Sequence, residues 1–168
     1  MDIFSTHERT SFGFEAKTAV LDFTANKYIG MNTSGREELV LGGYDFKLRS
    51  QVPYLHWAKI SATSYVWNGK NNRADLKGLK YASDITLSKT LQLGIAYDDN
   101  DSSGIEDEYE ANLTFVWPPV EGPTLFDGVA ITAWAENKDM SDQLLSKVQR
   151  NNKIVVQFQG TATISRAN

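Results

Sequence analysis

The sequence predicts an all-β fold, an antiparallel up-and-down transmembrane β-barrel of about seven or eight strands. Three observations indicate it: apolar and polar residues alternate, the alternating runs have membrane-spanning length, and short connections alternate with long ones. In residues 44–49 three apolar residues alternate with three charged ones, and similar runs follow at 79–88, 91–98 and 109–117. Neighbouring side chains of a strand point to opposite faces, so each run has one apolar face. With its flanks each run is about nine to eleven residues long, enough for a tilted strand to cross a bilayer.

The first four strands are expected near Thr10–Lys17, Ala19–Tyr28, Leu39–Arg49 and Trp57–Trp67. In the first two, Phe, Leu and Ala alternate with Gly, Glu, Asp, Thr and Asn. The third contains the 44–49 run, and the fourth begins and ends on tryptophan. These residue types favour half-buried strands.

The last three strands are expected near Leu79–Leu87, Leu91–Tyr97 and Tyr109–Trp117, where the alternation is clearest. Aromatic residues gather at the ends of the runs, as in the girdles that flank the apolar band of membrane barrels. We expect these aromatic residues at the membrane interface: Tyr44, Trp57, Trp67, Tyr97, Tyr109 and Trp117.

The connections differ in length in a regular way. Three are short and three are long, polar and rich in Gly, Asn, Asp and Ser. Outer-membrane barrels have short turns on one side and long loops on the other. The short connections are Lys17-Thr18, Gln51–His56 and Leu87–Thr90, and the long ones are Met31–Glu38, Asn68–Lys77 and Asp98–Glu108.

The chain changes character after Trp117, so residues 1–117 are expected to form the strands and residues 118–168 a linker. Pro118-Pro119 cannot continue a central strand. Val129–Ala135 is a candidate for one more extended piece. Ser141–Gln149 is expected to form a short helix with Ser141 as N-cap, and Lys153–Gln159 is expected to be extended.

Composition limits the function classes. The net charge of −4 argues against broad nucleic-acid binding. No apolar run is long enough for a transmembrane helix, and the absence of cysteine excludes disulfides and thiolate chemistry. The N-terminus has no signal-peptide pattern, which is expected of a cytosolic protein or of a mature form or fragment.

Four stretches of the chain resemble the β-domain of inverse autotransporters, the intimin and invasin type of bacterial outer-membrane adhesin. Their order along the chain is also that of the family. The stretch after the predicted helix is the most specific, because it resembles the family's Val-x-Arg-Asn-Asn linker. The four are Arg9–Ala16, Gly43–Leu55 (with Gly-Tyr-Asp-Phe-Lys-Leu-Arg and Val-Pro-Tyr-Leu), Leu91–Tyr97 and Val148–Val156.

The resemblance implies a bacterial outer-membrane barrel of about twelve strands whose linker enters the lumen and leads to an exported C-terminal passenger. The chain departs from that pattern, because it is expected to lack about five leading strands and a passenger. It also has Val156-Gln157-Phe158 where the family has an acidic residue and a tyrosine. Since an open edge is unfavourable in lipid, closure would need an eighth strand or a second chain, or the fragment would be nonfunctional. A closed eight-stranded barrel would leave no room for a threaded linker.

The expected site is the lumen and its linker, held by Val148, Arg150, Asn151 and Asn152. Arg150 would pair with lumen carboxylates. The alternative is an ordinary helix C-terminus. The candidate carboxylates are Asp45, Asp84 and Glu110.

No catalytic constellation, cofactor or metal site is expected, and the chain is not expected to be an enzyme. Ser50 and His56 are interpreted as turn residues, and Asp98–Glu108 as a solvated acidic loop rather than a calcium site. The expected partners are the lipid bilayer and the barrel-assembly machinery. The alternative function is a soluble lipocalin-like barrel, with its apolar face turned inward around a ligand.

Overall fold

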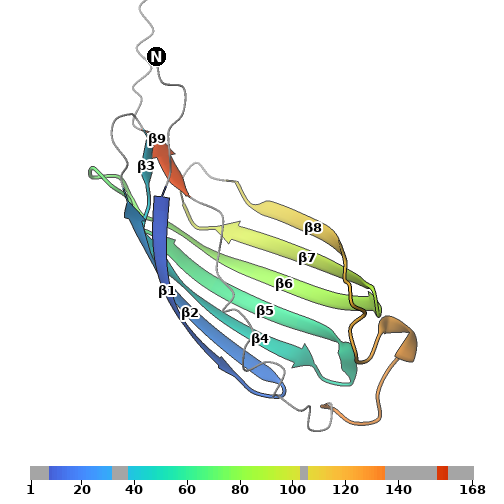
Figure 1. Cartoon of the computed structure of the whole chain (residues 1–168). Helices are drawn as coiled ribbons and strands as arrows, with labels where there is room; N and C mark the ends of the chain where they lie inside the picture. The colour runs from blue at the N-terminus through green and yellow to red at the C-terminus, as the bar shows by residue number, and fades with distance from the viewer. Residues whose placement is uncertain (1–7, 32–37, 103–105, 135–154, 159–168) are drawn as a thin grey trace, which may run out of the picture.

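The computed structural model describes residues 8–31, 38–102, 106–134 and 155–158. Its main element is one antiparallel sheet of seven strands in the order β1-β2-β4-β5-β6-β7-β8, which curves into an open trough (Figure 1). The predicted all-β, up-and-down fold class is therefore confirmed. The strands are β1 (Glu8–Lys17), β2 (Leu21–Met31), β4 (Gly43–Val52), β5 (Leu55–Trp67), β6 (Leu76–Ser88), β7 (Leu91–Asn100) and β8 (Glu108–Phe115).

The register sorts polar and apolar side chains onto opposite faces of this sheet. One row that crosses all seven strands is polar, and the next row is apolar, made of aromatic residues, one leucine and two alanines. The apolar row lies on the convex face, where side chains such as Leu48 and Tyr81 are about half exposed. The polar row is Glu15, Thr24, Lys47, Thr63, Lys80, Asp98 and Glu108, and the apolar row is Ala16, Phe23, Leu48, Ala62, Tyr81, Tyr97 and Tyr109.

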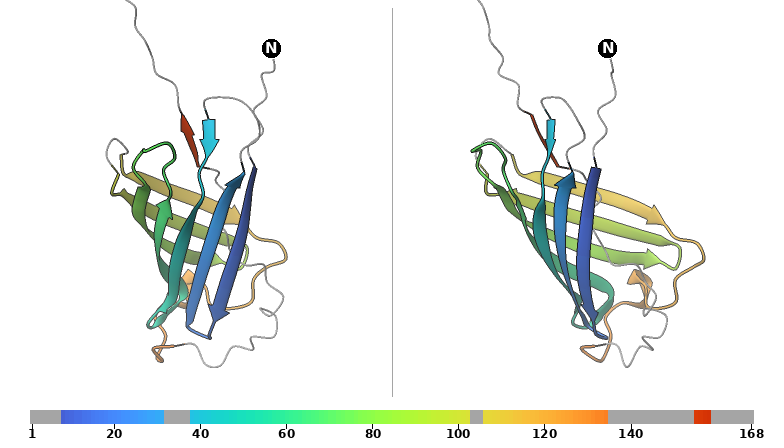
Figure 2. Two further views of the ribbon diagram at one scale, coloured as in Figure 1. Left: turned by 90° about the vertical axis from the view of Figure 1, so that its left-hand side faces the viewer. Right: turned by 60° about the vertical axis from the view of Figure 1, so that its left-hand side comes forward.

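Short and long connections lie at opposite ends of the trough (Figure 2). Residues 18–20, 53–54 and 89–90 make the tight turns of one end, which we call the turn end. The long connections 32–42, 68–75 and 101–107 lie at the other end, the loop end. Tyr54 has a φ of 64°, the left-handed conformation that lets a two-residue turn reverse the chain.

The strand predicted over Leu39–Arg49 is divided in the structure. Its first residues form β3 (Glu38–Val40), which leaves the main sheet and pairs with β9 (Val156–Phe158) in a two-stranded antiparallel sheet. The division falls at Gly42-Gly43, where the backbone passes close to its neighbours. A Cβ on Gly43 would lie 2.1 Å from the Val66 carbonyl oxygen. Of the extended stretch predicted over Lys153–Gln159, residues 156–158 form β9, and residues 153, 154 and 159 lie outside the described residues.

Residues 116–134, here called the strap, follow β8 along the turn end. The Val116 N–H donates to Thr90 O (2.9 Å), and the Val120 N–H donates to Lys89 O (2.8 Å). The strap contains one short helix, η1 (Leu125–Asp127). Further on, Ala130 N–H donates to Tyr54 O (2.8 Å).

The extended piece considered at Val129–Ala135 adds no strand to the main sheet. Residues 129 and 131–134 form bends, residue 130 is irregular, and Ala135 lies outside the described residues. A side chain holds this part of the strap instead: the Trp57 Nε1–H donates a hydrogen bond to Gly128 O (2.7 Å). The helix predicted at Ser141–Gln149 also lies outside the described residues. Across the described ranges, no helix has both the length and the apolar character needed to span a membrane.

Candidate functional site

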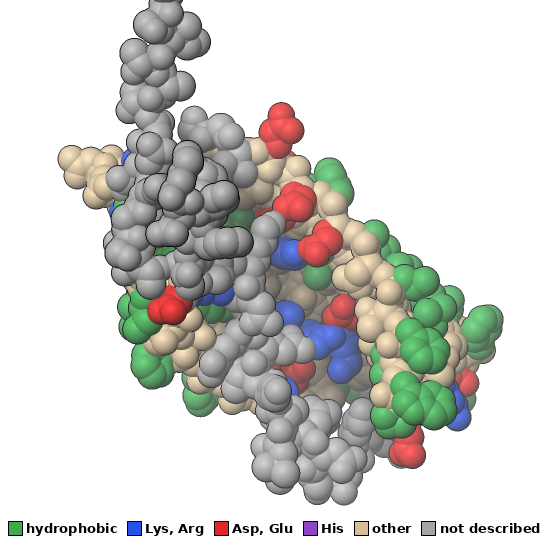
Figure 3. Space-filling model, turned by 45° about the horizontal axis from the view of Figure 1, so that its top comes forward, with side chains coloured by type: hydrophobic (Ala, Val, Ile, Leu, Met, Phe, Trp, Pro, Cys, Tyr) green, Lys and Arg blue, Asp and Glu red, His purple; other side chains and the backbone are tan. Residues whose placement is uncertain are grey.

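The concave face of the main sheet gathers polar and charged side chains (Figure 3). Lys, Arg, Asp and Glu side chains line the hollow, while apolar side chains lie on its outer sides. This distribution follows from the alternation of the strands, since every second side chain must enter the trough. It is the reverse of a soluble ligand-binding barrel, which places its apolar face inward.

The loop end of the concave face is filled by an aromatic cluster. Tyr28, Leu41 and Trp67 are buried to 3% exposure or less, and the Tyr28 and Trp67 rings lie 5.1 Å apart. The Arg9 guanidinium lies over the Tyr28 ring at 4.3 Å from its centre. Val155, the residue before β9, packs against this cluster, and its carbonyl accepts a hydrogen bond from Leu41 N–H (3.0 Å).

Asp45 lies between this cluster and the polar groups of the concave face, and it forms hydrogen bonds within the concave face. The carboxylate is 5% exposed and accepts hydrogen bonds from Asn26 Nδ2 (2.9 Å) and from the Tyr28 hydroxyl (2.7 Å). A carboxylate at such depth is stable only when its oxygens are hydrogen-bonded. Asp45 therefore fixes the Tyr28 ring beneath Arg9.

Charge pairs cross the middle of the concave face. Lys80 Nζ and Glu110 Oε2 lie 2.5 Å apart, bridging β6 and β8 across β7. Arg49 forms an ion pair with Asp84, from β4 to β6 across β5. These pairs link strands that are not direct neighbours, so side chains brace the curvature of the trough.

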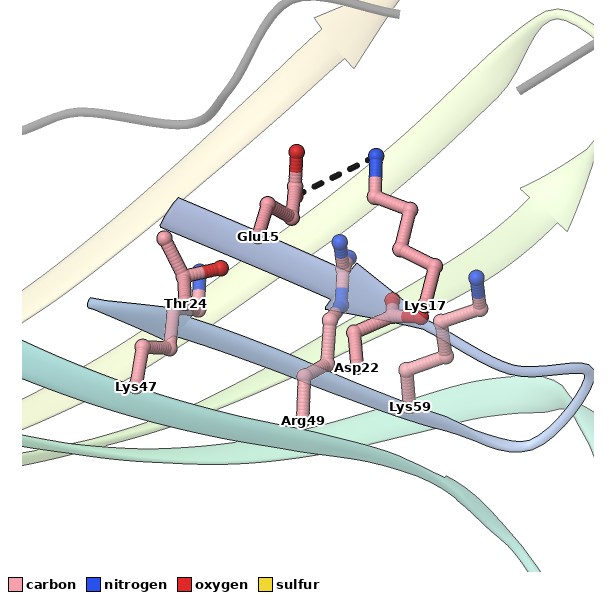
Figure 4. Close-up of a pocket in the computed structure, with 7 residues that line it drawn as sticks. All are labelled: Glu15, Lys17, Asp22, Thr24, Lys47, Arg49 and Lys59. Carbon is pink, nitrogen blue, oxygen red and sulfur yellow. Dashed lines mark ion pairs between the residues drawn. The ribbon is translucent and has the colours of Figure 1, made fainter. Parts of the chain in front are cut away.

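A hollow near the turn end gathers side chains from four strands, with cations on three of them: β1, β4 and β5 (Figure 4). It is lined by Glu15, Lys17, Asp22, Thr24, Lys47, Arg49 and Lys59. Lys17 and Glu15 form an ion pair of 3.2 Å along β1. Four of the seven lining residues are cations and two are carboxylates, and we call this site the basic hollow.

The predicted lumen carboxylates all lie on the concave face, each with a partner on another strand. Asp45 is bonded to Asn26 and Tyr28, Asp84 is paired with Arg49, and Glu110 is paired with Lys80. The residues predicted to meet them lie outside the described residues, namely Val148, Arg150, Asn151 and Asn152.

The six aromatic residues expected at the membrane interface divide between the two faces. Tyr44, Tyr97 and Tyr109 lie on the convex face, and the Tyr97 and Tyr109 rings are 4.8 Å apart. Trp117 is 76% exposed, just beyond β8. Trp67 is buried against Tyr28 and Trp57 donates to the strap, so the position of these two tryptophans differs from the expected one.

Several residues that shape the concave face carry no distinctive signal in the sequence. Arg9, Tyr28 and Lys59 belong to alternating runs, so the face of the sheet on which each lies could have been assigned from its odd or even place in the run. Which side chains of different strands come together depends on the stagger between strands, and the alternation within one strand does not give that stagger.

Ser50 and His56 bond to separate backbone groups. The Ser50 hydroxyl donates to Gln51 O (3.1 Å), and His56 Nε2 lies 2.9 Å from Thr132 O. Over the described ranges, no group of three or more His, Asp or Glu side chains is arranged to hold a metal ion.

The family model described as "Inverse autotransporter, beta-domain" matches residues 1–152 of the chain. The chain belongs to this family. Membership implies a bacterial outer-membrane location and a β-barrel translocator role. Inverse autotransporter β-domains are translocator domains.

A comparison with curated proteins gives no match. Among solved structures, one described as "Unveiling the Mechanism Behind the in-meso Crystallization of Membrane Proteins" is similar, with a TM-score of 0.63. The two chains are 15% identical, and the alignment covers 89% of this chain and 67% of that chain. At this identity the likeness concerns the fold alone.

Proposed function

We propose that this inverse autotransporter chain forms the wall of an outer-membrane pore, and that its C-terminal linker crosses the pore to display a passenger on the cell surface. The convex face would contact lipid and the concave face would contact the linker. The polar concave face supports this role, because an extended chain needs hydrogen-bonding partners along its path.

One observation carries the proposal: the linker is attached at both ends of the trough. Ala133 O accepts a hydrogen bond from Tyr54 N–H (2.9 Å) at the turn end, whereas Val155 packs against the aromatic cluster at the loop end. Residues 135–154 must therefore bridge the length of the sheet. At about 3.3 Å per extended residue, a segment of this length is long enough to span the longest strand.

Within the linker, Arg150, Asn151 and Asn152 are proposed to hold the segment in the pore, with Val148 beside them. Arg150 would compete for the carboxylates of Asp45, Asp84 or Glu110. If Arg150→Ala changed neither heat resistance nor passenger display, this holding role would be wrong.

Closure of the pore requires strands that the described part of the chain does not contain. β1 and β8 each have a single strand neighbour there. Open edges cannot be satisfied in lipid. We propose that further strands cover these edges, and a second copy of this chain is one source. The barrel-assembly machinery would insert the closed product.

Membrane fractionation tests the proposal directly. The outer-membrane pellet is run on a gel with and without boiling, and a band that shifts on boiling is expected from a closed, lipid-embedded barrel. A soluble, monodisperse protein whose band does not shift would contradict the membrane role. A reporter fused after Asn168 then tests display, because surface exposure of the reporter requires passage through the pore.

A further inference from the structure

The lining of the basic hollow holds four cations and two carboxylates. Two further carboxylates act on these cations: Asp84 pairs with Arg49, and Asp45 attracts Lys47. The Nε–H of Arg49 is buried with no hydrogen-bond partner in the described part of the chain. A buried donor without an acceptor is costly, so this one favours an incoming acceptor.

The opposite half of the concave face has the opposite charge. On β6, β7 and β8 the inward rows hold one cation, Lys80, against four carboxylates. A negatively charged segment in the trough is therefore attracted to the β1–β5 half and repelled from the β6–β8 half. The four carboxylates are Asp84, Asp98, Glu108 and Glu110.

The chain itself delivers such a segment beside the hollow. The strap is fixed at Tyr54, in the turn between β4 and β5, by hydrogen bonds from and to residues 130 and 133. Arg49 and Lys59 lie on these two strands close to that turn. The next eight residues after Trp134 contain three acidic residues and one lysine, namely Glu136, Asp139, Asp142 and Lys138.

We propose that the basic hollow binds the carboxylates of linker segment Ala135–Asp142, and so guides the linker onto the β1–β5 half of the trough. This inference rests on the proposed passage of the linker through the pore. It adds the partner and the chemistry: Lys47, Arg49 and Lys59 receive side-chain carboxylates by charge-assisted hydrogen bonds. The remaining half of the trough stays available for the passenger chain.

Disulfide trapping in the full chain tests the docking, since the protein contains no cysteine. Thr24→Cys places a thiol in the wall of the basic hollow. It is combined in turn with Asn137→Cys, Ser146→Cys or Asn151→Cys, and each double variant is oxidised in detergent micelles. The Asn137 pair is expected to cross-link at least tenfold faster than the other two.

Substitutions that remove charge then test whether the linker binds the basic hollow by charge or only lies near it. Lys47→Gln with Lys59→Gln, or Glu136→Gln with Asp139→Asn, should slow the Asn137 cross-link several-fold, and added salt should do the same. Lys77→Gln, at the loop end of β6, is the matched control and should leave the rate unchanged. The measurement with added salt is made on protein that keeps Lys47 and Lys59. It therefore remains decisive even if the double lysine variant fails to fold.

The outcomes distinguish this inference from the proposed function. Equal rates at all three linker positions, or rates insensitive to charge and salt, would overturn the docking but leave linker passage intact. Cross-links between two molecules would assign the hollow to a second copy and overturn it as well. If Thr24→Cys trapped none of the linker positions, both the docking and the passage of the linker would be wrong.

Discussion

Asp45 fixes two side chains of neighbouring strand β2 through its two carboxylate oxygens. Asp45→Ala leaves the Asn26 amide and the Tyr28 hydroxyl buried without this acceptor, which costs about 1–3 kcal/mol for each donor. We expect a correspondingly lower free energy of unfolding, measured by urea titration in detergent micelles.

The matched control is Asp101→Ala, which removes an exposed carboxylate from a long connection. This substitution should change the free energy of unfolding by no more than about 0.5 kcal/mol. Equal losses in the two variants would show that the Asp45 hydrogen bonds contribute no stability of their own.

Asp127 makes the η1 turn sensitive to acid. The Thr124 backbone N–H and hydroxyl donate to its carboxylate, and these hydrogen bonds lower the pKa of Asp127 from its ordinary value of 3.8. A carboxylate with a lowered pKa stabilises the folded turn above its ordinary pKa, and this contribution is lost as the pH falls through the lowered pKa.

The turn should therefore persist at pH 4 and loosen only below 3.8. The Trp57 indole N–H resonance reports it by NMR, because this group donates to Gly128 O beside Asp127. Asp127→Asn should remove the transition. A midpoint at or above the ordinary pKa would contradict the role given to the two Thr124 donors.

Gly43 lets strands β4 and β5 approach each other at the loop end. A Cβ at this position would meet the Val66 carbonyl oxygen at 2.1 Å, and backbone cannot move aside cheaply. Gly43→Ala should therefore lower the free energy of unfolding by about 1–3 kcal/mol or more. Urea titration of the folded protein in micelles gives the value.

Gly94→Ala is the comparison, since the new Cβ would meet the end of the Asn112 side chain, 2.6 Å away. A side-chain amide can rotate, so this variant should lose less stability than Gly43→Ala. The reverse order would show that the close approach of β4 and β5 is relieved elsewhere.

Strand positions could be predicted from the sequence because period two is a local property. The main strands begin and end within a few residues of the expected limits, as for Leu91–Tyr97 and β7. The division of Leu39–Arg49 could not be predicted, because Leu39-Val40-Leu41 is an ordinary apolar run. Its partner in β9 is more than a hundred residues away, and no local pattern encodes that pairing.

For the whole molecule, the proposed function makes the convex face the surface in contact with the bilayer. Leu48 is 49% exposed in the central apolar row. Leu48→Arg should cost about 2–4 kcal/mol of folding free energy, as expected for Arg near the bilayer midplane. Denaturant titration in lipid vesicles measures it, with Asn68→Arg in a long connection as control. Equal, small losses of folding free energy in the two variants would place the apolar row outside the hydrocarbon part of the bilayer.

The face of three candidate site residues follows from their sequence position, but their partners could not be predicted. Asp45, Asp84 and Glu110 lie on the concave face, as their parity indicates. The ion pairs of Asp84 and Glu110 reach across an intervening strand, as from Arg49 to Asp84. Such contacts depend on the curvature and stagger of the whole sheet, which arise only when all seven strands are assembled.

The pairing of β3 with β9 gives the molecule a defined response to mechanical load. β3 is antiparallel to β9 and continues into β4 by its C-terminal end. A pull on the chain beyond Phe158, directed away from the trough, draws β9 along its own axis while β4 holds β3 from the opposite side. The three residue pairs are then loaded together in shear, rather than opened one after another like a zipper. Tension at the C-terminal side would thus be borne by this small sheet and passed directly to the wall of the trough.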